Sequence, residues 1–322
     1  MVTFDVTDGK ELINNVVAMN QPTQPLKPIL VAHLFPKIEA MLFELLHSLA
    51  PDDWEVQTIA PKWKVKDVVS HLLDTQLRKL SMARDGCRDA HAVVHTPADL
   101  VALVDRLNEE GVSIYRRLSP QVLISLMEVA SRESAEYHQS LNPFAPADVG
   151  VSWAGEHQSL NWFDTAREYT ERWHHQQQIR LAVNRPGIMT PEPYHPVIDC
   201  FMRALPHGYR SMPADNGTLL QVEISGECGG TWYLYRSDEL WHLIDRPAGK
   251  VASLVKVPQE IAWRIFTKGI DQRSAVAQIQ IDGDSVLGCH PTRYGAGSHE
   301  IWRNAAKAVQ TRISYHGSKN VL

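Results

Sequence analysis

Apolar residues recur at intervals of three and four along the first 183 positions, which is the pattern of helices packed around a shared core. Pro36 lies inside the first periodic segment, so its helix either begins there or is kinked. The dipeptides Asp85-Gly86, Thr96-Pro97 and Ser119-Pro120 supply stop and start signals between the later segments. The pattern predicts helices over residues 29–49, 63–86, 97–117, 120–141 and 162–183.

The pattern changes after Asn184-Arg185-Pro186-Gly187, which ends the fifth helix. The proline-rich run at 190–196 is the predicted domain boundary. β-rich runs separated by Gly, Asp or Pro follow, and they lie at 218–227, 230–236, 239–245, 250–257 and 276–281, with helices near 197–205, 260–269 and 299–309. We therefore expect a multi-domain α and α+β protein. Residues 1–188 would form a four-helix bundle and residues 189–322 a smaller α+β domain, with an antiparallel sheet and helices on one side.

Composition narrows the class of protein. The 322 residues are 44% apolar and 21% charged, which is ordinary for a globular protein. The net charge is −5 and Lys and Arg form no runs, so we expect the protein to bind neither nucleic acid nor an anionic membrane surface. No apolar run approaches the roughly 20 residues that span a bilayer, and the N-terminus lacks a signal peptide. The four Cys show no CxxC spacing, so the sequence contains neither a zinc knuckle nor a redox motif of that kind. We expect the cysteines to be reduced and the protein to be cytoplasmic.

The segment 162–183 carries a pair of side chains suited to metal binding. Glu171 and His175 stand four residues apart, so on a helix their carboxylate and imidazole lie on one face. Periodicity alone also allows Glu171 and His175 to be two solvent-exposed side chains that bind no metal, because this face is polar and lies opposite the apolar stripe of the same helix. His174 is a rival partner of Glu171 at a spacing of three, but it lies nearer the apolar stripe and is interpreted as a packing residue.

A third ligand is available on the helix that begins near Trp63. His71 stands at the border of that helix's apolar stripe, where a side chain can face a cleft. Together, His71, Glu171 and His175 would give three protein ligands and an open fourth position. This arrangement is typical of a catalytic divalent metal rather than of a closed structural one.

Two stretches of the sequence resemble a known family. The segment WKVKDVVSHLL, with a Trp before a His, and the segment EYTERWHHQQQIR, with Glu-x-x-x-His, are similar to the mycothiol-dependent maleylpyruvate isomerases of the DinB-like helical bundle group. The resemblance matches His71, Glu171 and His175 to the three metal ligands, and Gln178 to a position where the family commonly has Asp. The run VKVPQEIAWRIFTKG is similar to the family's second domain, whose fold is related to sterol carrier proteins.

The resemblance implies a metal-dependent isomerase or thiol transferase. A divalent ion, with zinc the first expectation and Ni, Fe or Mn open, would activate a low-molecular-weight thiol such as mycothiol. In the isomerases the thiol adds to a cis double bond, the adduct rotates and the thiol leaves. A positively charged side chain would bind the acidic group of a small substrate. Arg78 is the nearest candidate in the sequence, and Arg180 is the next. The remaining expectations are a monomer or a homodimer whose partners are the substrate and a small thiol.

Two other functions stay open at this point. The helical domain could be a non-catalytic relative in a protein that binds a small molecule or a lipid. Alternatively, the same three ligands could support a metal-dependent hydrolase in which water replaces the thiol.

Overall fold

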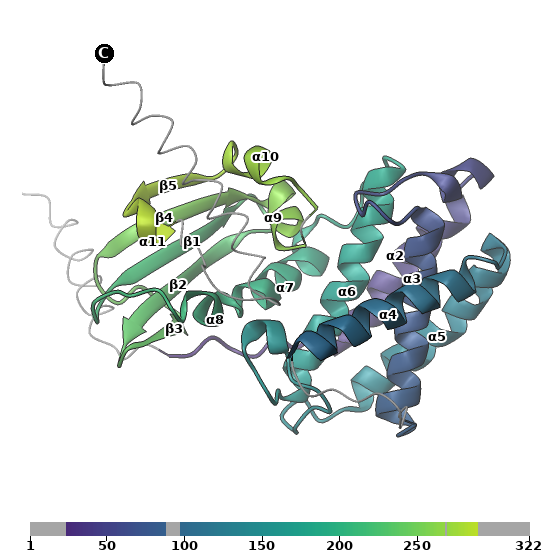
Figure 1. The fold of residues 1–322 in the computed structure, drawn as a ribbon, viewed down its shortest axis with the longest axis horizontal. Helices are drawn as coiled ribbons and strands as arrows, with labels where there is room; N and C mark the ends of the chain where they lie inside the picture. The colour runs from purple at the N-terminus through teal and green to yellow at the C-terminus, as the bar shows by residue number, and fades with distance from the viewer. Residues whose placement is uncertain (1–23, 88–96, 268, 289–322) are drawn as a thin grey trace, which may run out of the picture.

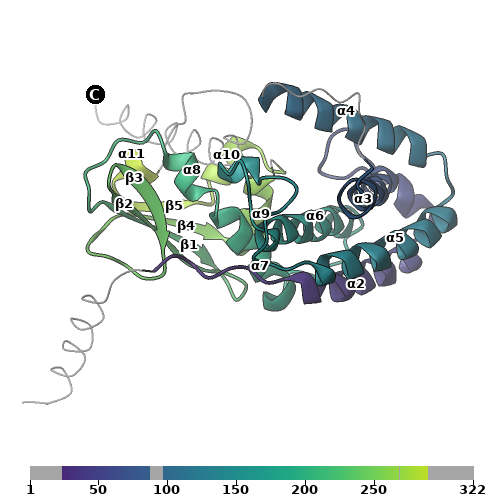
Figure 2. The ribbon, with the colours of Figure 1, turned by 90° about the horizontal axis from the view of Figure 1, so that it is seen from below.

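The computed structural model describes residues 24–87, 97–267 and 269–288 (Figure 1). The helical part confirms the predicted bundle, in which α2, α3, α5 and α6 pack against one another and α4 packs on the outer side of α3 (Figure 2). These helices are α2 (Phe35–Ser48), α3 (Val65–Lys79), α4 (Pro97–Tyr115), α5 (Pro120–Ser140) and α6 (Asn161–Ala182). The short turns are η1 (Ala32–Leu34), η2 (Pro51–Glu55), η3 (Leu80–Arg84) and η4 (Ser152–Ala154).

The helix ends follow the expected chemistry. Pro36 stands in the first turn of α2, so that helix begins there and is not kinked. Ser119 caps α5 by accepting a hydrogen bond from the Val122 N–H at 3.4 Å. Beyond Lys79 the chain continues as the π-helical turn η3, in which the Asp85 N–H donates to the Leu80 carbonyl at 3.0 Å. The predicted cap residue Thr96 lies outside the described residues.

The C-terminal half forms a five-stranded sheet with short helices. Its elements are α7 (Pro191–Met202), α8 (Leu205–Tyr209), β1 (Leu219–Ser225), β2 (Gly230–Ser237), β3 (Leu240–Ile244), β4 (Val251–Pro258), α9 (Gln259–Phe266), α10 (Gln272–Val276), β5 (Gln280–Gly283) and α11 (Ser285–Gly288). The strand order is β3-β2-β1-β4-β5. Helices α7 and α9 lie between the sheet and the bundle (Figure 1).

The sheet refines the predicted topology in two respects. Three of its pairings are antiparallel as expected, but β1 and β4 pair in parallel, so the sheet is mixed. This pairing arises because the β2-β3 hairpin occupies one edge of β1 and β4 must return along the other. The predicted last strand is confined to 280–283, since Val276 ends α10. The predicted helix at 299–309 lies outside the described residues.

One face of the sheet carries the core. Along β1, Leu220, Val222 and Ile224 are buried, whereas Gln221 and Glu223 between them are partly exposed. This alternation agrees with helices packed on one side. No helix among the described residues has the length and apolar character to cross a membrane.

Aromatic side chains join the two halves of the chain. The Trp173 ring of α6 stacks on Tyr194 of α7, with centroids 4.2 Å apart, and meets Trp263 of α9 edge-on at 6.0 Å. The Tyr194 hydroxyl donates to the Gln259 carbonyl at 2.8 Å and accepts from the Trp263 N–H at 3.2 Å. The run at 190–196 opens α7 directly. The division into residues 1–188 and 189–322 stays a prediction.

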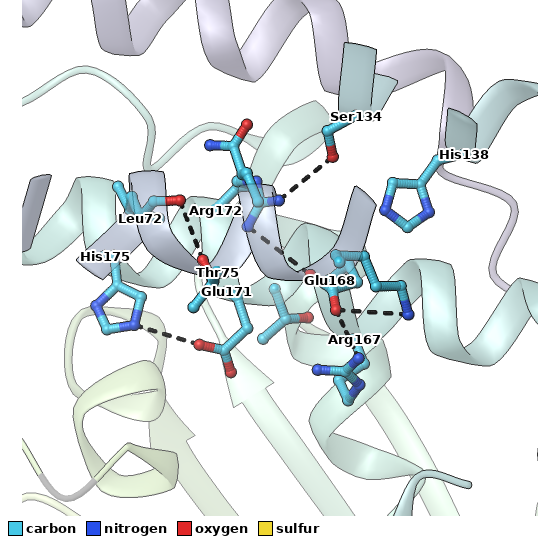
Figure 3. A network of polar contacts seen from close by, with 12 residues as sticks. Leu72, Thr75, Ser134, His138, Arg167, Glu168, Glu171, Arg172 and His175 are labelled. Atoms are coloured by element: carbon cyan, nitrogen blue, oxygen red, sulfur yellow. Dashed lines mark hydrogen bonds and ion pairs between the residues drawn. The ribbon is translucent and has the colours of Figure 1, made fainter. Parts of the chain in front are cut away.

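The interior of the bundle holds a network of charged side chains (Figure 3). Arg172 of α6 lies 3.2 Å from Glu39 of α2 and 3.7 Å from Glu168, measured between nitrogen and oxygen atoms. Lys79 of α3 donates to Asp164 at 2.5 Å. These side chains are all buried or nearly so. The charges therefore neutralise one another inside the bundle, where an unpaired charge would be costly.

His138 of α5 lies beside this network. Its ring stacks on Phe35 with centroids 4.7 Å apart, and Nδ1 lies 3.4 Å from the Thr165 hydroxyl. Burial, with smaller contributions from nearby cations, lowers the pKa of His138 to about 4. The imidazole is therefore neutral in the folded protein at neutral pH.

We expect His138 to make stability fall in mild acid. The unfolded chain takes up a proton near pH 6.5 but the folded chain only near pH 4, so the stability contributed by the neutral ring is complete above pH 6.5 and is lost as pH falls to about 4. The loss amounts to roughly 3 kcal/mol. Urea unfolding at several pH values should show a shallower pH dependence in His138→Gln than in the native protein; equal slopes would contradict the assignment.

Candidate metal centre

His71 lies in the second turn of α3, whose start is fixed by Asp67. The Asp67 carboxylate accepts hydrogen bonds from the Lys64 N–H at 3.1 Å and from Arg116 Nε at 3.0 Å. Buried apolar side chains on both sides of His71, including Leu72, pack into the bundle core. His71 itself is only 4% exposed. It is thus held more deeply than the border position inferred from periodicity.

The three predicted ligands meet between α3 and α6. His175 Nε2 lies 3.2 Å from Glu171 Oε2, one helical turn away on α6 (Figure 3). The His71 ring approaches the His175 ring nearly at right angles, with centroids 4.6 Å apart. One ligand atom from each of the three side chains lies within 4.8 Å of the other two. The geometry therefore allows all three to converge on one ion.

Trp63 forms one side of this centre. Its ring lies 4.6 Å from the His71 ring and 5.9 Å from the His175 ring. Both histidines are buried, whereas the Glu171 side chain is 41% exposed. Solvent therefore reaches the Glu171 side chain more than it reaches either imidazole.

The protonation states suit metal ligands. Burial, and secondarily the neighbouring His175, lowers the pKa of His71 well below its ordinary value, so the imidazole is neutral. For Glu171, partial loss of water favours a higher pKa, but the hydrogen bond with His175 and the nearby imidazoles lower it to about 2. A neutral imidazole and an ionised carboxylate are the forms that bind a metal ion.

The hydrogen bonding of the two histidines is compatible with a bound cation. The buried Nδ1 of His71 has no hydrogen-bond partner in the described part of the chain. His175 faces an acceptor at each ring nitrogen, Gln178 Oε1 at 2.9 Å and Glu171 Oε2 at 3.2 Å. A neutral imidazole has a single N–H and can donate to only one of these two acceptors. A second proton on the ring, or a metal ion between His175 and Glu171, would satisfy the other acceptor. Two imidazoles and one carboxylate suit Zn, Ni, Fe or Mn.

His174 is not part of the triad. Its Nε2 lies 3.0 Å from Gln178 Nε2, and its ring lies 6.1 Å from the ring of Trp263. Burial, and then the neighbouring His175, lowers the pKa of His174 to about 3. A neutral imidazole packed against α9 agrees with the interpretation as a packing residue.

The two arginines suggested by the sequence are anchored elsewhere. Arg78 donates to Asp74 from Nε and to Asn108 from Nη2, both at 2.7 Å, and so links α3 to α4. Arg180 donates to the main-chain carbonyls of Met41 and Pro186 at 2.8 and 3.1 Å. A role for Arg78 in the site stays a prediction.

Sequence reasoning missed Arg167, which is closer to the centre along α6. It stands one turn before Glu171, and its side chain is 24% exposed. Between residues 163 and 180 of α6, only Arg167, Glu171 and His174 are partly exposed, and the other residues are buried. The spacing of four from a predicted ligand was the signal that could have identified it.

Comparisons with known proteins found a matching family model and similar solved structures. Residues 35–180 match the family model described as "Mycothiol maleylpyruvate isomerase N-terminal domain". No curated protein matches the chain. Two solved structures, of mycothiol-dependent maleylpyruvate isomerase and of a mutant of it, are similar at 10% identity, with TM-scores of 0.46 and 0.45. Each alignment covers 73% of this chain and 86% of the other.

The region matched by the family model runs from the start of α2 to near the end of α6 and includes all three converging side chains. The resemblance found in the sequence is thereby confirmed. Over residues 35–180, the chain is therefore similar to the mycothiol maleylpyruvate isomerase N-terminal domain.

Proposed function

We propose that this protein is a metal-dependent isomerase that uses a low-molecular-weight thiol on a small acidic substrate. The family match supports an enzyme, and an isomerase in particular. The observation that carries the proposal is the convergence of His71, Glu171 and His175 from two helices. A site of this kind matches the chemistry that the family name describes.

The three side chains would hold one divalent ion, with zinc as the first expectation. When bound, the ion supplies positive charge that lowers the pKa of a thiol or of water at the open position. Trp63 shields the imidazoles from solvent on one side, and Glu171 leaves the approach open on the other. The thiol therefore enters past Glu171.

Arg167 is suited to hold a carboxylate of the substrate. Burial alone would lower its pKa, but the carboxylates of Glu168 and Asp164 raise it above the ordinary value, so the guanidinium stays charged. Its Nε and Nη2 donate to these two carboxylates, and within the described residues Nη1 makes no hydrogen bond. This donor group would therefore be free to bind a substrate carboxylate, one helical turn before Glu171.

The reaction needs no nucleophile from the protein. Burial raises the pKa of Cys200 to about 12 and that of Cys228 to about 11, so neither is a thiolate at neutral pH. The thiol of the cofactor would instead form a carbon–sulfur bond to one carbon of a cis double bond conjugated to a carbonyl. Rotation about the resulting single bond, followed by cleavage of the carbon–sulfur bond, returns the thiol and the trans isomer.

Thiol and metal dependence test the proposal directly. We expect the purified protein to isomerise maleylpyruvate with mycothiol present, and to lose this activity without thiol or after treatment with a chelator. The conversion is followed by the change in ultraviolet absorbance. Turnover that is independent of thiol but dependent on metal would favour a hydrolase instead, and activity that survives full metal removal would refute the metal role.

The ligand assignment predicts loss of metal in three variants. His71→Ala, Glu171→Gln and His175→Ala should each reduce bound zinc from about one ion per chain to traces, because two remaining ligands hold the ion far less tightly. Elemental analysis after gel filtration measures this. His138→Gln, which alters a buried histidine away from the centre, should retain the ion. A ligand variant with full metal content would remove that residue from the site.

Substrate affinity should depend on Arg167. Loss of a charge-assisted hydrogen bond in Arg167→Met should raise KM by about 10- to 100-fold, with a smaller effect on kcat. Arg78→Met is the matched comparison because Arg78 is similarly exposed, at 26%, and also pairs with a carboxylate, that of Asp74, but stands on α3. We expect a smaller rise in KM for that variant. The reverse order would identify Arg78 as the substrate-binding cation.

A further inference from the structure

Gln178 is buried one turn after the ligand pair and contacts two histidines with the two ends of its amide. Its Oε1 lies 2.9 Å from His175 Nδ1 and its Nε2 lies 3.0 Å from His174 Nε2. The side chain is held in the interior, with Gln178 only 5% exposed. The amide therefore bridges a predicted ligand and its neighbour.

The chemistry of the amide assigns the roles of the nitrogens. A carbonyl oxygen only accepts, so His175 Nδ1 must carry a hydrogen and donate it to Oε1. The hydrogen of a neutral imidazole is then used at Nδ1, and the lone pair at Nε2 points toward Glu171 and the centre. Gln178 thus selects the tautomer in which His175 can bind an ion through Nε2.

The observed orientation of the amide also assigns a role to His174. Gln178 Nε2 can only donate, so His174 Nε2 must accept. The His174 ring also packs against the ring of Trp263 on α9, so the C-terminal half of the chain helps to hold His174 in place beside Gln178. Rotation of the amide by half a turn would reverse both contacts and would require both imidazoles to take the other tautomer.

We propose that Gln178 is a positioning residue that fixes the tautomer and the ring orientation of His175 for metal binding. The inference rests on the proposed function of the same site. An amide does this without adding negative charge, whereas a carboxylate at the same place would donate electron density to the ligand. The ion would therefore keep more of its positive charge for the bound thiol.

The test compares zinc affinity in three variants. Gln178→Leu removes the acceptor, Gln178→Glu keeps an acceptor oxygen of the same reach, and Gln177→Leu makes the same change at a neighbouring glutamine that is 6% exposed. Dissociation constants come from competition with a chelating dye, and the visible spectrum of the cobalt-loaded proteins reports ligand geometry. Thermal unfolding of the metal-free forms shows whether each variant is folded.

We expect Gln178→Leu to bind zinc about 10- to 100-fold more weakly and to alter the cobalt spectrum. Gln178→Glu should bind zinc at least as tightly as the native protein does. Gln177→Leu should have the same zinc affinity as the native protein. Equal affinity of Gln178→Leu and the native protein, or a loss in Gln178→Glu as large as in Gln178→Leu, would overturn the inference. A native protein that binds no zinc would also overturn it. Affinities in the expected order without thiol-dependent isomerisation would refute the proposed function and leave the inference standing.

Discussion

Helix α6 is buried along most of its circumference, so its polar side chains must find partners inside the protein. Of its 22 residues, 15 are buried, among them Asp164, Glu168 and Arg172. A buried charge without a partner costs several kcal/mol, and removing one member of such a pair is correspondingly destabilising. The helix can therefore lie in the bundle at one rotation only, the one that directs these charges toward their partners on neighbouring helices.

This constraint also places the metal centre. Helices α3 and α6 are antiparallel and meet at two points, Lys79 with Asp164 near one end and His71 with His175 nearer the other. The ion pair and the apolar core hold both helices at fixed rotations without any metal. Glu171 and His175 then face His71 as a consequence of the packing. A preformed set of ligands needs little rearrangement to bind an ion, which favours affinity.

The sequence supported the choice of ligands better than the description of their surroundings. The spacing of Glu171 and His175 and the position of His71 suggested the triad, the family resemblance matched the same three residues, and the structure brings them together. Periodicity, however, described the polar face of α6 as opposite the core, which suggested solvent. It could not show that Glu39 and Lys79, about 130 and 85 to 90 positions away from their partners, would cover that face. The parallel pairing of β1 and β4 was missed for the same reason, since the order of strands depends on contacts distant in the sequence.

The charges of the two buried regions serve different ends. In the network, Glu39, Asp164 and Glu168 face Lys79, Arg167 and Arg172, and these charges balance. At the candidate centre, the divalent ion of the proposed function would face a single carboxylate and two imidazoles, and the neutral amide of Gln178 adds no negative charge. Because the network carries no net negative charge, it does not offset the field of the ion one helical turn away. With that ion bound, the centre would keep a net positive charge, and the proposed function requires such a charge to stabilise a thiolate and to attract an acidic substrate.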